Sequence, residues 1–392
     1  MRRWPVMGDA GDVTRQVLIL GAGFGGLELS TLLSERLADK VEITLIDQND
    51  SFMFGFSKLD IVFRGRTWDQ VRIPYVSMAR PGVQFRQETV VSIDPKQRRV
   101  VTDSATYDAD VLVVALGADY DQAATPGLVE GGFEYYSMAG AERLRDELPS
   151  FTGGRVLLSV LSIPFKCPPA PYEGILLLHD YLVERGIREA TQMHVITPQP
   201  SPIPVSPEAS AAVEQAMAER GISYTKRHRV YGIDPATNTA RLKDHEEPYD
   251  LFIGVPVHKA PAVLTESGLT QDGWVRVDRR THETQFAGVF AIGDCTETGI
   301  PKAGVFAEAA AQALAGTIED RIKRSDDEPS SGTSNAGAAQ CFLEFGRGEV
   351  GRVDVDFLAP GGPTAPLRGP GPQYVQEKEA FGAIRRTRWF AE

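Results

Sequence analysis

A strand-like run followed at once by a glycine-rich turn constrains this chain more than any other feature. Residues 17–20 are apolar, and a Gly-Ala-Gly-Phe-Gly-Gly segment begins directly after them at Gly21. An amphipathic stretch, 27–37, and a second apolar run, 41–46, come next. This order predicts a strand, a tight turn, a helix and a second strand, which together form a βαβ unit.

Each glycine of the motif has a physical reason to be there. Gly21 permits the tight turn, Gly23 lets the backbone approach a pyrophosphate, and Gly26 lets the helix pack closely on the strand. The free N–H groups at the start of the helix then face the phosphates. Asp47 ends the second strand, where its carboxylate can accept hydrogen bonds from ribose hydroxyls. Strand, helix and acid in this register predict a dinucleotide-binding lobe.

The alternation of strand-like and helical segments continues along the chain. Further apolar runs at 111–116, 155–160 and 194–197 are separated by helical stretches. We therefore predict an α/β protein with two Rossmann-like, doubly wound nucleotide-binding lobes and a small C-terminal module. The predicted boundaries are 15–118 with 276–323 for the first lobe, 119–275 for the second lobe, 324–339 for a polar linker and 340–392 for the module.

Composition narrows the function classes. The net charge of -12 over 392 residues argues against a nucleic-acid partner, because binding phosphates requires an excess of Lys and Arg. No run approaches the roughly 20 apolar residues that a transmembrane helix needs. Pro5, Gly8 and Asp9 stand where a secretory signal would be apolar, so a cytoplasmic location is expected. The histidines and cysteines lack metal-ligand spacing, so no metal site is expected.

Two later segments resemble the second and third FAD motifs of flavoproteins with two dinucleotide-binding domains. The first, 107–118, contains Gly117, and the second, 288–294, ends on the pair Gly293-Asp294. The resemblance implies FAD as the cofactor of the first lobe. It also implies that Asp294 binds the ribitol or pyrophosphate side of that cofactor.

A helix is expected after the third motif, within 301–308. Its N-terminus would face the flavin, and Lys302 there would stabilise negative charge on the reduced ring. The alternative is that Lys302 is an ordinary solvent-facing lysine.

The second lobe lacks the glycine turn that a nicotinamide dinucleotide requires. Its first strand, 155–160, runs into a segment with four prolines and no glycine before Gly174. Prolines and bulky side chains keep the backbone away from a pyrophosphate. The strand at 195–197 also lacks a terminal acid. A degenerate NAD site is therefore predicted.

A cysteine takes the place of that turn. Cys167 lies just beyond the C-terminal end of a predicted parallel strand, where ligands meet open α/β sheets. The segment 163–173, Ile-Pro-Phe-Lys-Cys-Pro-Pro-Ala-Pro-Tyr-Glu, resembles the sulfide:quinone oxidoreductases and the flavin subunit of flavocytochrome c sulfide dehydrogenases. The resemblance implies that Cys167 is one of a redox pair near the flavin, that Glu173 is a candidate base, and that Cys341 is the partner thiol. For each cysteine the alternative is a buried, inert thiol.

The chain also departs from these families. Quinone-linked members commonly carry a third active-site cysteine, and 118–140 contains none. Cytochrome-linked members attach FAD through a cysteine, but 51–57 offers no thiol, so non-covalent FAD is expected. The resemblance thus implies a cytoplasmic, two-cysteine enzyme that oxidises sulfide or a related sulfur compound and passes electrons to a quinone. The alternatives are a type II NAD(P)H:quinone dehydrogenase and a non-catalytic FAD-binding protein.

The C-terminal end mixes aromatic and basic residues, which allows two interpretations. Such a tail suits the headgroup region at the inner face of a membrane, or it forms a helix docked on its own domain. A monomer and a homodimer are both open, and His258 is expected in an exposed loop. The residues of the tail are Phe381, Ile384, Arg385, Arg386, Arg388, Trp389 and Phe390.

Overall fold

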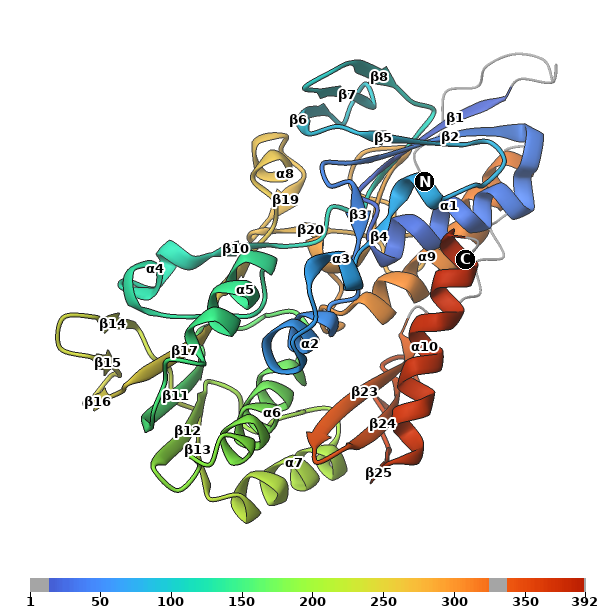
Figure 1. Ribbon diagram of the computed structural model, residues 1–392. Coiled ribbons are helices and arrows are strands. Elements are labelled where there is room, and N and C mark those ends of the chain that lie inside the picture. Colours follow the sequence, from blue (N-terminus) through green and yellow to red (C-terminus); the bar gives the residue numbers. More distant parts are fainter. Residues whose placement is uncertain (1–13, 324–336, 391–392) are drawn as a thin grey trace.

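The computed structural model describes residues 14–323 and 337–390 (Figure 1). The first lobe is built on a five-stranded sheet in the order β21-β9-β1-β2-β5, and every neighbouring pair is parallel. The edge strand β21 comes from a segment far along the chain, so the lobe is assembled from two stretches of sequence. The strands are β1 (Arg15–Leu20), β2 (Val41–Asp47), β5 (Val83–Gln87), β9 (Val111–Val114) and β21 (Val289–Ala291).

Both faces of this sheet are covered, which explains why its strands are apolar nearly throughout. Helices α1 (Phe24–Leu37) and α9 (Gly304–Lys323) pack against each other on one face. Antiparallel strands and a short helix form the cover on the other face. These are β6 (Val90–Asp94), β7 (Arg99–Thr102), β8 (Thr106–Asp108), α8 (Ala262–Glu266), β19 (Thr270–Gln271), β20 (Trp274–Arg276) and β22 (Thr296–Glu297).

The second lobe has its own parallel sheet, in the order β13-β12-β11-β17. Three helices pack on one face, and a three-stranded antiparallel sheet with a short helix packs on the other. The α/β prediction with two parallel-sheet lobes is confirmed. The elements are α4 (Leu128–Gly131), α5 (Met138–Glu147), β11 (Gly154–Val160), α6 (Ala170–Glu184), β12 (Thr191–Thr197), α7 (Pro207–Glu219), β13 (Ile222–Lys226), β14 (Gly232–Asp234), β15 (Thr239–Arg241), β16 (Glu246–Pro248) and β17 (Leu251–Val255).

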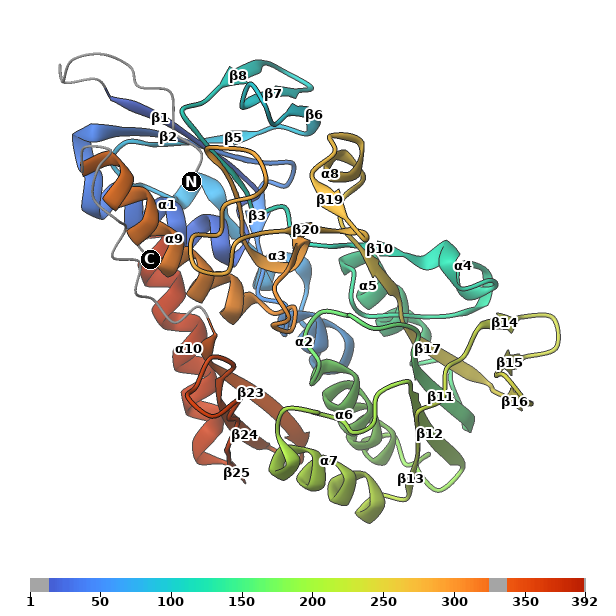
Figure 2. The ribbon, with the colours of Figure 1, turned by 180° about the vertical axis from the view of Figure 1, so that it is seen from behind.

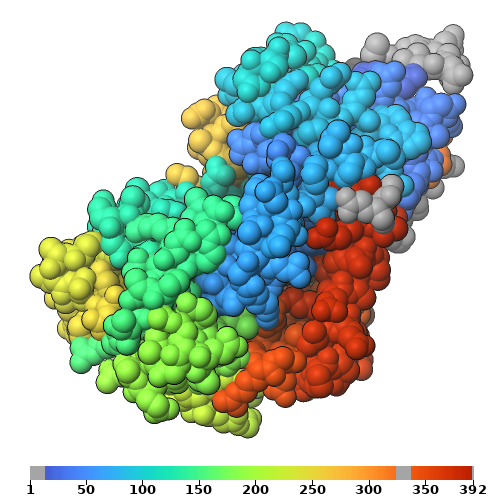
Figure 3. All heavy atoms as spheres, viewed as in Figure 1, coloured from blue at the N-terminus to red at the C-terminus, as the bar shows by residue number. Residues whose placement is uncertain are grey.

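The chain crosses between the lobes twice, and the two crossings pair as the antiparallel strands β10 (Asp119–Asp121) and β18 (Val257–Lys259). A further segment of the first lobe reaches down to α5 and α6. Figure 3 shows it as a blue strip between the green second lobe and the red C-terminal residues. Its elements are β3 (Ser51–Phe52), α2 (Ser57–Arg64), α3 (Trp68–Val71) and β4 (Ile73–Pro74).

The C-terminal module is a three-stranded antiparallel sheet followed by a long helix, α10 (Gln373–Phe390). Its strands are β23 (Ala338–Gly346), β24 (Glu349–Asp356) and β25 (Leu367–Gly371). Because β23 begins at Ala338, the last two residues of the expected linker belong to a strand; residues 324–336 lie outside the described part. The sheet packs on α6 and α9, and α10 runs back to α1 (Figure 2).

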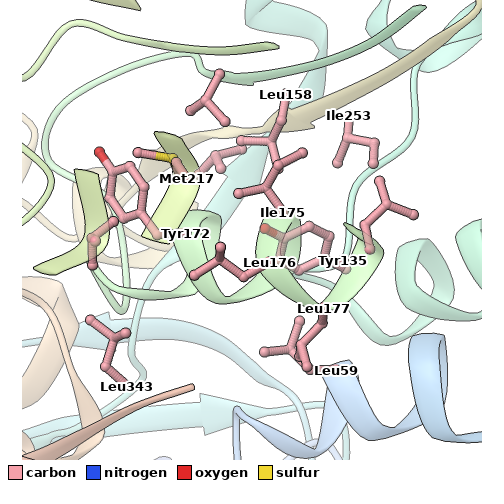
Figure 4. Packing of buried hydrophobic residues seen from close by; sticks show 14 of the residues in the cluster. Leu59, Tyr135, Leu158, Tyr172, Ile175, Leu176, Leu177, Met217, Ile253 and Leu343 are labelled. Carbon is pink, nitrogen blue, oxygen red and sulfur yellow. The ribbon is translucent and has the colours of Figure 1, made fainter. Parts of the chain in front are cut away.

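The hydrophobic core around α6 receives side chains from all three parts of the molecule (Figure 4). Leu59 of α2 lies beside Leu177 of α6, and Leu343 of β23 belongs to the same buried cluster. All three side chains are buried. This packing fixes α6 relative to both the first lobe and the module.

Candidate functional site

A cavity of about 880 Å³ lies where the two lobes meet. Its volume is within the range of cofactor sites, and its walls come from segments widely separated in sequence. The carboxyl ends of β1 and β9 open into it, as expected for a ligand site of an open parallel sheet. Lining residues include Gly21, Gly23, Phe24, Asp47, Phe56, Lys58, Gly117, Tyr120, Tyr136, Lys166, Cys167, Glu173, Gly293, Asp294 and Gly304.

The three glycines of the first motif are required for different reasons. A Cβ on Gly21, which has φ +101°, would lie 2.3 Å from the carbonyl oxygen of Ala115. A Cβ on Gly26 would lie 1.9 Å from the carbonyl oxygen of Gly21. A Cβ on Gly23 would meet no atom within 4 Å, because this residue faces the cavity. Gly23 therefore leaves room for a ligand, whereas Gly21 and Gly26 leave room for the protein itself.

Asp47 lies at the end of β2 and lines the cavity. Its Oδ2 accepts a 2.7 Å hydrogen bond from the backbone N–H of Ala22, and its Oδ1 accepts bonds from the backbone and side-chain nitrogens of Asn49, both 2.9 Å long. These bonds hold the carboxylate against the glycine turn. Oδ2, which accepts one bond, can still accept a further bond from a ribose hydroxyl.

The second and third motifs also meet at the cavity. Gly117 and Gly293 have φ +71° and +78°, a conformation that favours glycine, and both line the wall. Asp294 lines it too, and burial raises the pKa of its carboxyl against the opposing charges of Lys166 and Lys302. Gly304, the first residue of α9, brings that helix N-terminus to the same wall.

Lys302 is not where the sequence suggested. Its Nζ donates hydrogen bonds to the carbonyl oxygens of Asp294 (2.8 Å) and Thr296 (3.0 Å), and it lies 3.4 Å from the ring centroid of Trp274. The side chain is buried and lines a separate small cavity. Neither the expected placement at the flavin nor the solvent-facing alternative is met, because two carbonyls and an aromatic face hold the ammonium in the interior.

Cys167 lies at the wall of the main cavity, three residues before α6 begins. Its backbone N–H donates to the carbonyl oxygen of Lys302 (2.8 Å), and its carbonyl accepts from the N–H of Ala170 (2.9 Å). These bonds hold the residue at φ +51°, an uncommon conformation for a non-glycine residue. The residue is accessible from the cavity. Burial of the thiol within the protein raises its pKa.

Glu173 and Cys341 lie near Cys167. Glu173 is buried in the first turn of α6, and burial raises its pKa to about 7. Cys341 is on β23, where burial and then Glu173 raise the pKa of its thiol to about 12. Burial, then the charges of Glu173 and Cys341, raise the pKa of Cys167. Cys167 and Glu173 both line the cavity, Cys341 is not among its lining residues, and both thiols are free.

Beside Glu173 lies an ion cluster around the buried Glu344 that the sequence did not reveal. The carboxylate of Glu344 accepts hydrogen bonds from Arg64 of α2 and Lys378 of α10. Those two cations lower its pKa against the effect of burial. The cluster ties the C-terminal module to the first lobe and is linked to Glu173 through the backbone N–H of Glu344. Its members are more than 30 residues apart in sequence, so no spacing signal could have identified them.

Two lysines at the cavity wall, Lys58 and Lys166, were also missed as functional candidates. Lys166 directly precedes Cys167, which was the only available signal for it. Nothing in the sequence around Lys58 distinguishes it from a surface lysine.

His258 is not the exposed loop histidine that was expected. It lies in β18 with 6% of its surface exposed, and its ring packs edge-on against Tyr120 and Tyr136. Nδ1 bonds to the carbonyl oxygen of Pro256 at 2.8 Å. Burial, then the charge of Lys166, lowers its pKa to about 3, so the ring is neutral at physiological pH.

Of the two interpretations of the C-terminal end, the structure shows the docked helix. Trp389 and Phe390 are buried in the first-lobe core. Arg385 bonds to Glu308 and Arg388 to Glu28, so these arginines are engaged within the protein. The membrane interpretation of this tail is therefore wrong, because its aromatic side chains complete the core of the first lobe. None of the helices in the described ranges is long and apolar enough to span a bilayer.

Known proteins resemble the chain over most of its length. A mitochondrial sulfide:quinone oxidoreductase from Mus musculus is 27% identical over 322 residues, 76% of this chain and 68% of the relative. A type II NADH:quinone oxidoreductase from Staphylococcus saprophyticus is 31% identical over only 133 residues, 33% of each chain. The crystal structure of the sulfide:quinone oxidoreductase from Aquifex aeolicus matches with a TM-score of 0.85 and 24% identity, covering 96% of this chain and 92% of that chain. This structural likeness shows a shared fold.

The sequence model of one protein family matches residues of both lobes. The sequence model of the pyridine nucleotide-disulphide oxidoreductases matches residues 15–158 and 182–313. The interruption, 159–181, holds the turn with Cys167 and the first part of α6. The matched segments contain every strand of the two parallel sheets, apart from the last two residues of β11. The chain therefore belongs to the pyridine nucleotide-disulphide oxidoreductase family.

Proposed function

We propose that this oxidoreductase binds FAD non-covalently in the cavity between the lobes. The glycine turn and the start of α1 would hold the pyrophosphate, Asp47 a ribose, and Asp294 with the start of α9 the other end. Support comes from the open space over Gly23 and from the cavity volume of about 880 Å³. FAD, when bound there, would supply a two-electron acceptor beside the thiols.

We propose further that the electron donor is sulfide or a related sulfur compound. One observation carries this proposal: Cys167 and Glu173 line the same cavity, and Cys341 lies on β23, the strand whose Glu344 N–H bonds to the carboxylate of Glu173. The mouse relative, whose name states that it acts on sulfide and a quinone, aligns with 76% of this chain.

The residues can perform the sulfur transfer as follows. In the oxidised protein, Cys167 and Cys341 share a disulfide. Hydrosulfide attacks one sulfur, the S–S bond breaks, and one cysteine becomes a persulfide while the other leaves as a thiolate. Glu173 takes the proton of the hydrosulfide, a role suited to a carboxyl with a pKa of about 7. When the thiolate and the persulfide sulfur then join, two electrons are released to the acceptor.

NAD(P)H is the second candidate donor, favoured by the partial match to a type II NADH:quinone oxidoreductase. The turn after β11 argues against it, since this turn carries Pro164, Pro168 and Pro169 and lies in the interruption of the family pattern. Prolines there deny a pyrophosphate the backbone N–H groups that it needs. A non-catalytic FAD-binding protein is the third alternative.

For the electron acceptor we propose a quinone. If the quinone is dissolved in the bilayer, the protein would work at the cytoplasmic face of the membrane as a peripheral protein. Because α10 is docked, the contact would involve another surface. Flotation with lipid vesicles tests this attachment, and light scattering of the FAD-loaded protein distinguishes a homodimer from a monomer.

An anaerobic titration of the FAD-loaded protein tests the choice of donor. Sulfide should bleach the flavin absorbance band at one equivalent per flavin, and NADH should leave it unchanged. Bleaching by NADH alone would overturn the sulfide proposal in favour of the nicotinamide enzyme. Bleaching by neither donor would favour the non-catalytic protein. Acid or heat should release the flavin from the polypeptide, and flavin retained after denaturation would contradict non-covalent binding.

A further inference from the structure

Two lysines face the same cavity but differ in their partners. The Nζ of Lys166 donates a 2.8 Å hydrogen bond to the carbonyl oxygen of Ala118 and lies 4.3 Å from the ring centroid of Tyr120. The Nζ of Lys58 makes no hydrogen bond or ion pair with any residue in 14–323 or 337–390. A partly buried ammonium without an acceptor is unfavourable. Lys58 therefore points to an anion that occupies this part of the cavity.

The fold holds Lys58 in this position. It lies in the first turn of α2, and the next residue, Leu59, is buried in the core around α6. At the other end of the helix, Arg64 is bound to Glu344. Anchored at both ends, α2 cannot rotate to bring Lys58 into solvent.

A candidate for this anion is the sulfur of Cys167, which lines the same cavity as Lys58. Glu173 of α6 and Cys341 of β23 disfavour negative charge on its sulfur, as does burial. The other titratable groups that face the thiol are Tyr120, Tyr135 and Tyr136, whose pKa values are raised by burial so that they are neutral. The backbone N–H of Ala170 and then the positive charge of Lys58 oppose these effects. The sulfur chemistry nevertheless requires a thiolate or persulfide anion at this position.

We propose that Lys58 supplies the positive charge that balances the sulfur anion at Cys167, as a thiolate and as a persulfide. This inference rests on the proposed sulfur chemistry and adds a positioning residue to it. Burial, and then Lys166, lowers the pKa of Lys58 to about 8, while Glu134 and Cys167 raise it. Lys58 is therefore largely charged at neutral pH, and a negative sulfur nearby keeps it charged. The influence is mutual, since each group favours the charged form of the other.

The rate at which iodoacetamide alkylates Cys167 measures this influence without sulfide or quinone. The FAD-loaded protein would be reduced under anaerobic conditions, and the Cys167 peptide would be quantified by mass spectrometry over a range of pH. In Lys58→Met, the midpoint of alkylation should move to higher pH, and alkylation at pH about 8 should slow by roughly tenfold for each unit of that move. Lys58→Arg should restore most of the rate. Lys96→Met, at an exposed turn, is the matched control and should leave it unchanged.

Equal alkylation in Lys58→Met and wild type would overturn the proposal, as would equal slowing in Lys58→Met and Lys58→Arg. A second measurement leaves Lys58 intact and so avoids any folding defect of its variants. In Cys167→Ser, Lys58 should react faster with acetic anhydride, because loss of the thiolate lowers its pKa; an unchanged rate would also overturn the proposal. Neither readout involves sulfide, so a flavin that sulfide fails to reduce would overturn the proposed function alone.

Discussion

The backbone N–H of Glu344 donates a 3.0 Å hydrogen bond to Oε1 of Glu173. This bond joins β23 to the first turn of α6, three residues after Cys341. Burial raises the pKa of Glu173 to about 7; the charge of Glu344 adds to this rise, whereas Lys378, the N–H of Glu344 and Arg64 oppose it. The carboxyl that faces the thiols is thereby able to exchange a proton near neutral pH.

Replacing Glu173 with Gln removes this proton acceptor. In wild type, the rate of flavin reduction by sulfide should rise as the pH increases through about 7, because the carboxylate is the active form. Sulfide itself ionises in this range, so the informative quantity is the ratio of wild-type to Glu173→Gln rates. Stopped-flow absorbance should show that ratio growing with pH. A ratio that is constant from about pH 5 to 9 would exclude Glu173 as the base.

The same substitution has a signature in stability. The pKa of Glu173 is higher in the folded protein than its ordinary 4.5, so its contribution is fully present below that value and is lost as the pH rises through about 7. Wild type should therefore lose stability relative to Glu173→Gln over this window, by an amount on the order of 3 kcal/mol. Chemical unfolding of the two proteins at pH about 5 and 8 measures the difference.

The cluster of Arg64, Glu344 and Lys378 should set the pH midpoint of Glu173. Lys378→Met removes a charge that lowers the pKa of Glu173, so the midpoint of flavin reduction should move to higher pH, while Lys378→Arg should keep it. Arg64 still neutralises Glu344, so the loss of stability should be only about 1–3 kcal/mol, the cost of one lost hydrogen-bond partner. The double variant Arg64→Met/Lys378→Met should lose more than the sum of the two single changes, because it leaves a buried carboxylate unpaired. Additive losses would contradict this account.

Cys167→Ser and Cys341→Ser should each keep bound FAD yet lose sulfide-dependent flavin reduction by a large factor, because a hydroxyl cannot accept sulfur. The double variant should be scarcely worse than either single one, since the two thiols act as a unit. Cys295→Ser is the internal control: its sulfur is buried and lies 3.4 Å from the carbonyl oxygen of Ile292, within the first-lobe core. Reduction that persists in either active-site variant would refute the sulfur mechanism.

Two glycines of the first motif should respond differently to alanine. Gly23→Ala places its methyl group in open space, so the FAD-free protein should unfold within about 0.5 kcal/mol of wild type while its affinity for FAD falls. Gly26→Ala places a methyl group 1.9 Å from the carbonyl oxygen of Gly21, so the folded state of the FAD-free protein should be destabilised. Calorimetry with and without FAD separates the two effects. Equal losses of fold stability would show that Gly23 also has a packing role.

Trp389→Ala should destabilise the first lobe rather than weaken attachment to lipid. The ring is fully buried, and its Nε1 donates a 2.8 Å hydrogen bond to Oε2 of Glu28, which Arg388 also binds. Truncating a buried tryptophan costs about 3–5 kcal/mol. Ile384→Ser, at a side chain with 63% of its surface exposed on the same helix, is the matched control and should unfold like wild type. A Trp389→Ala protein of normal stability that fails to float with vesicles would restore the membrane interpretation.

The sequence by itself determined the features that depend on local chemistry. Gly21 to Gly26 and Asp47 identified the first βαβ unit, because a tight turn, a close helix and a terminal acid must occur at short, regular spacings. The prolines after β11 predict a degenerate second site for the same reason. Cys167 and Glu173, six residues apart around the start of one helix, could be found together.

Only the tertiary structure decided what lies around those residues. Lys302 lies two residues before Gly304, at the start of α9, yet two carbonyls and the ring of Trp274 hold its side chain away from the main cavity. Lys58 has no local signal, yet the packing of α2 turns it towards the cavity that Cys167 lines. Burial and the charges of side chains distant in sequence set the proton affinity of Glu173. Electrostatic effects depend on separation in space, which a linear pattern does not contain.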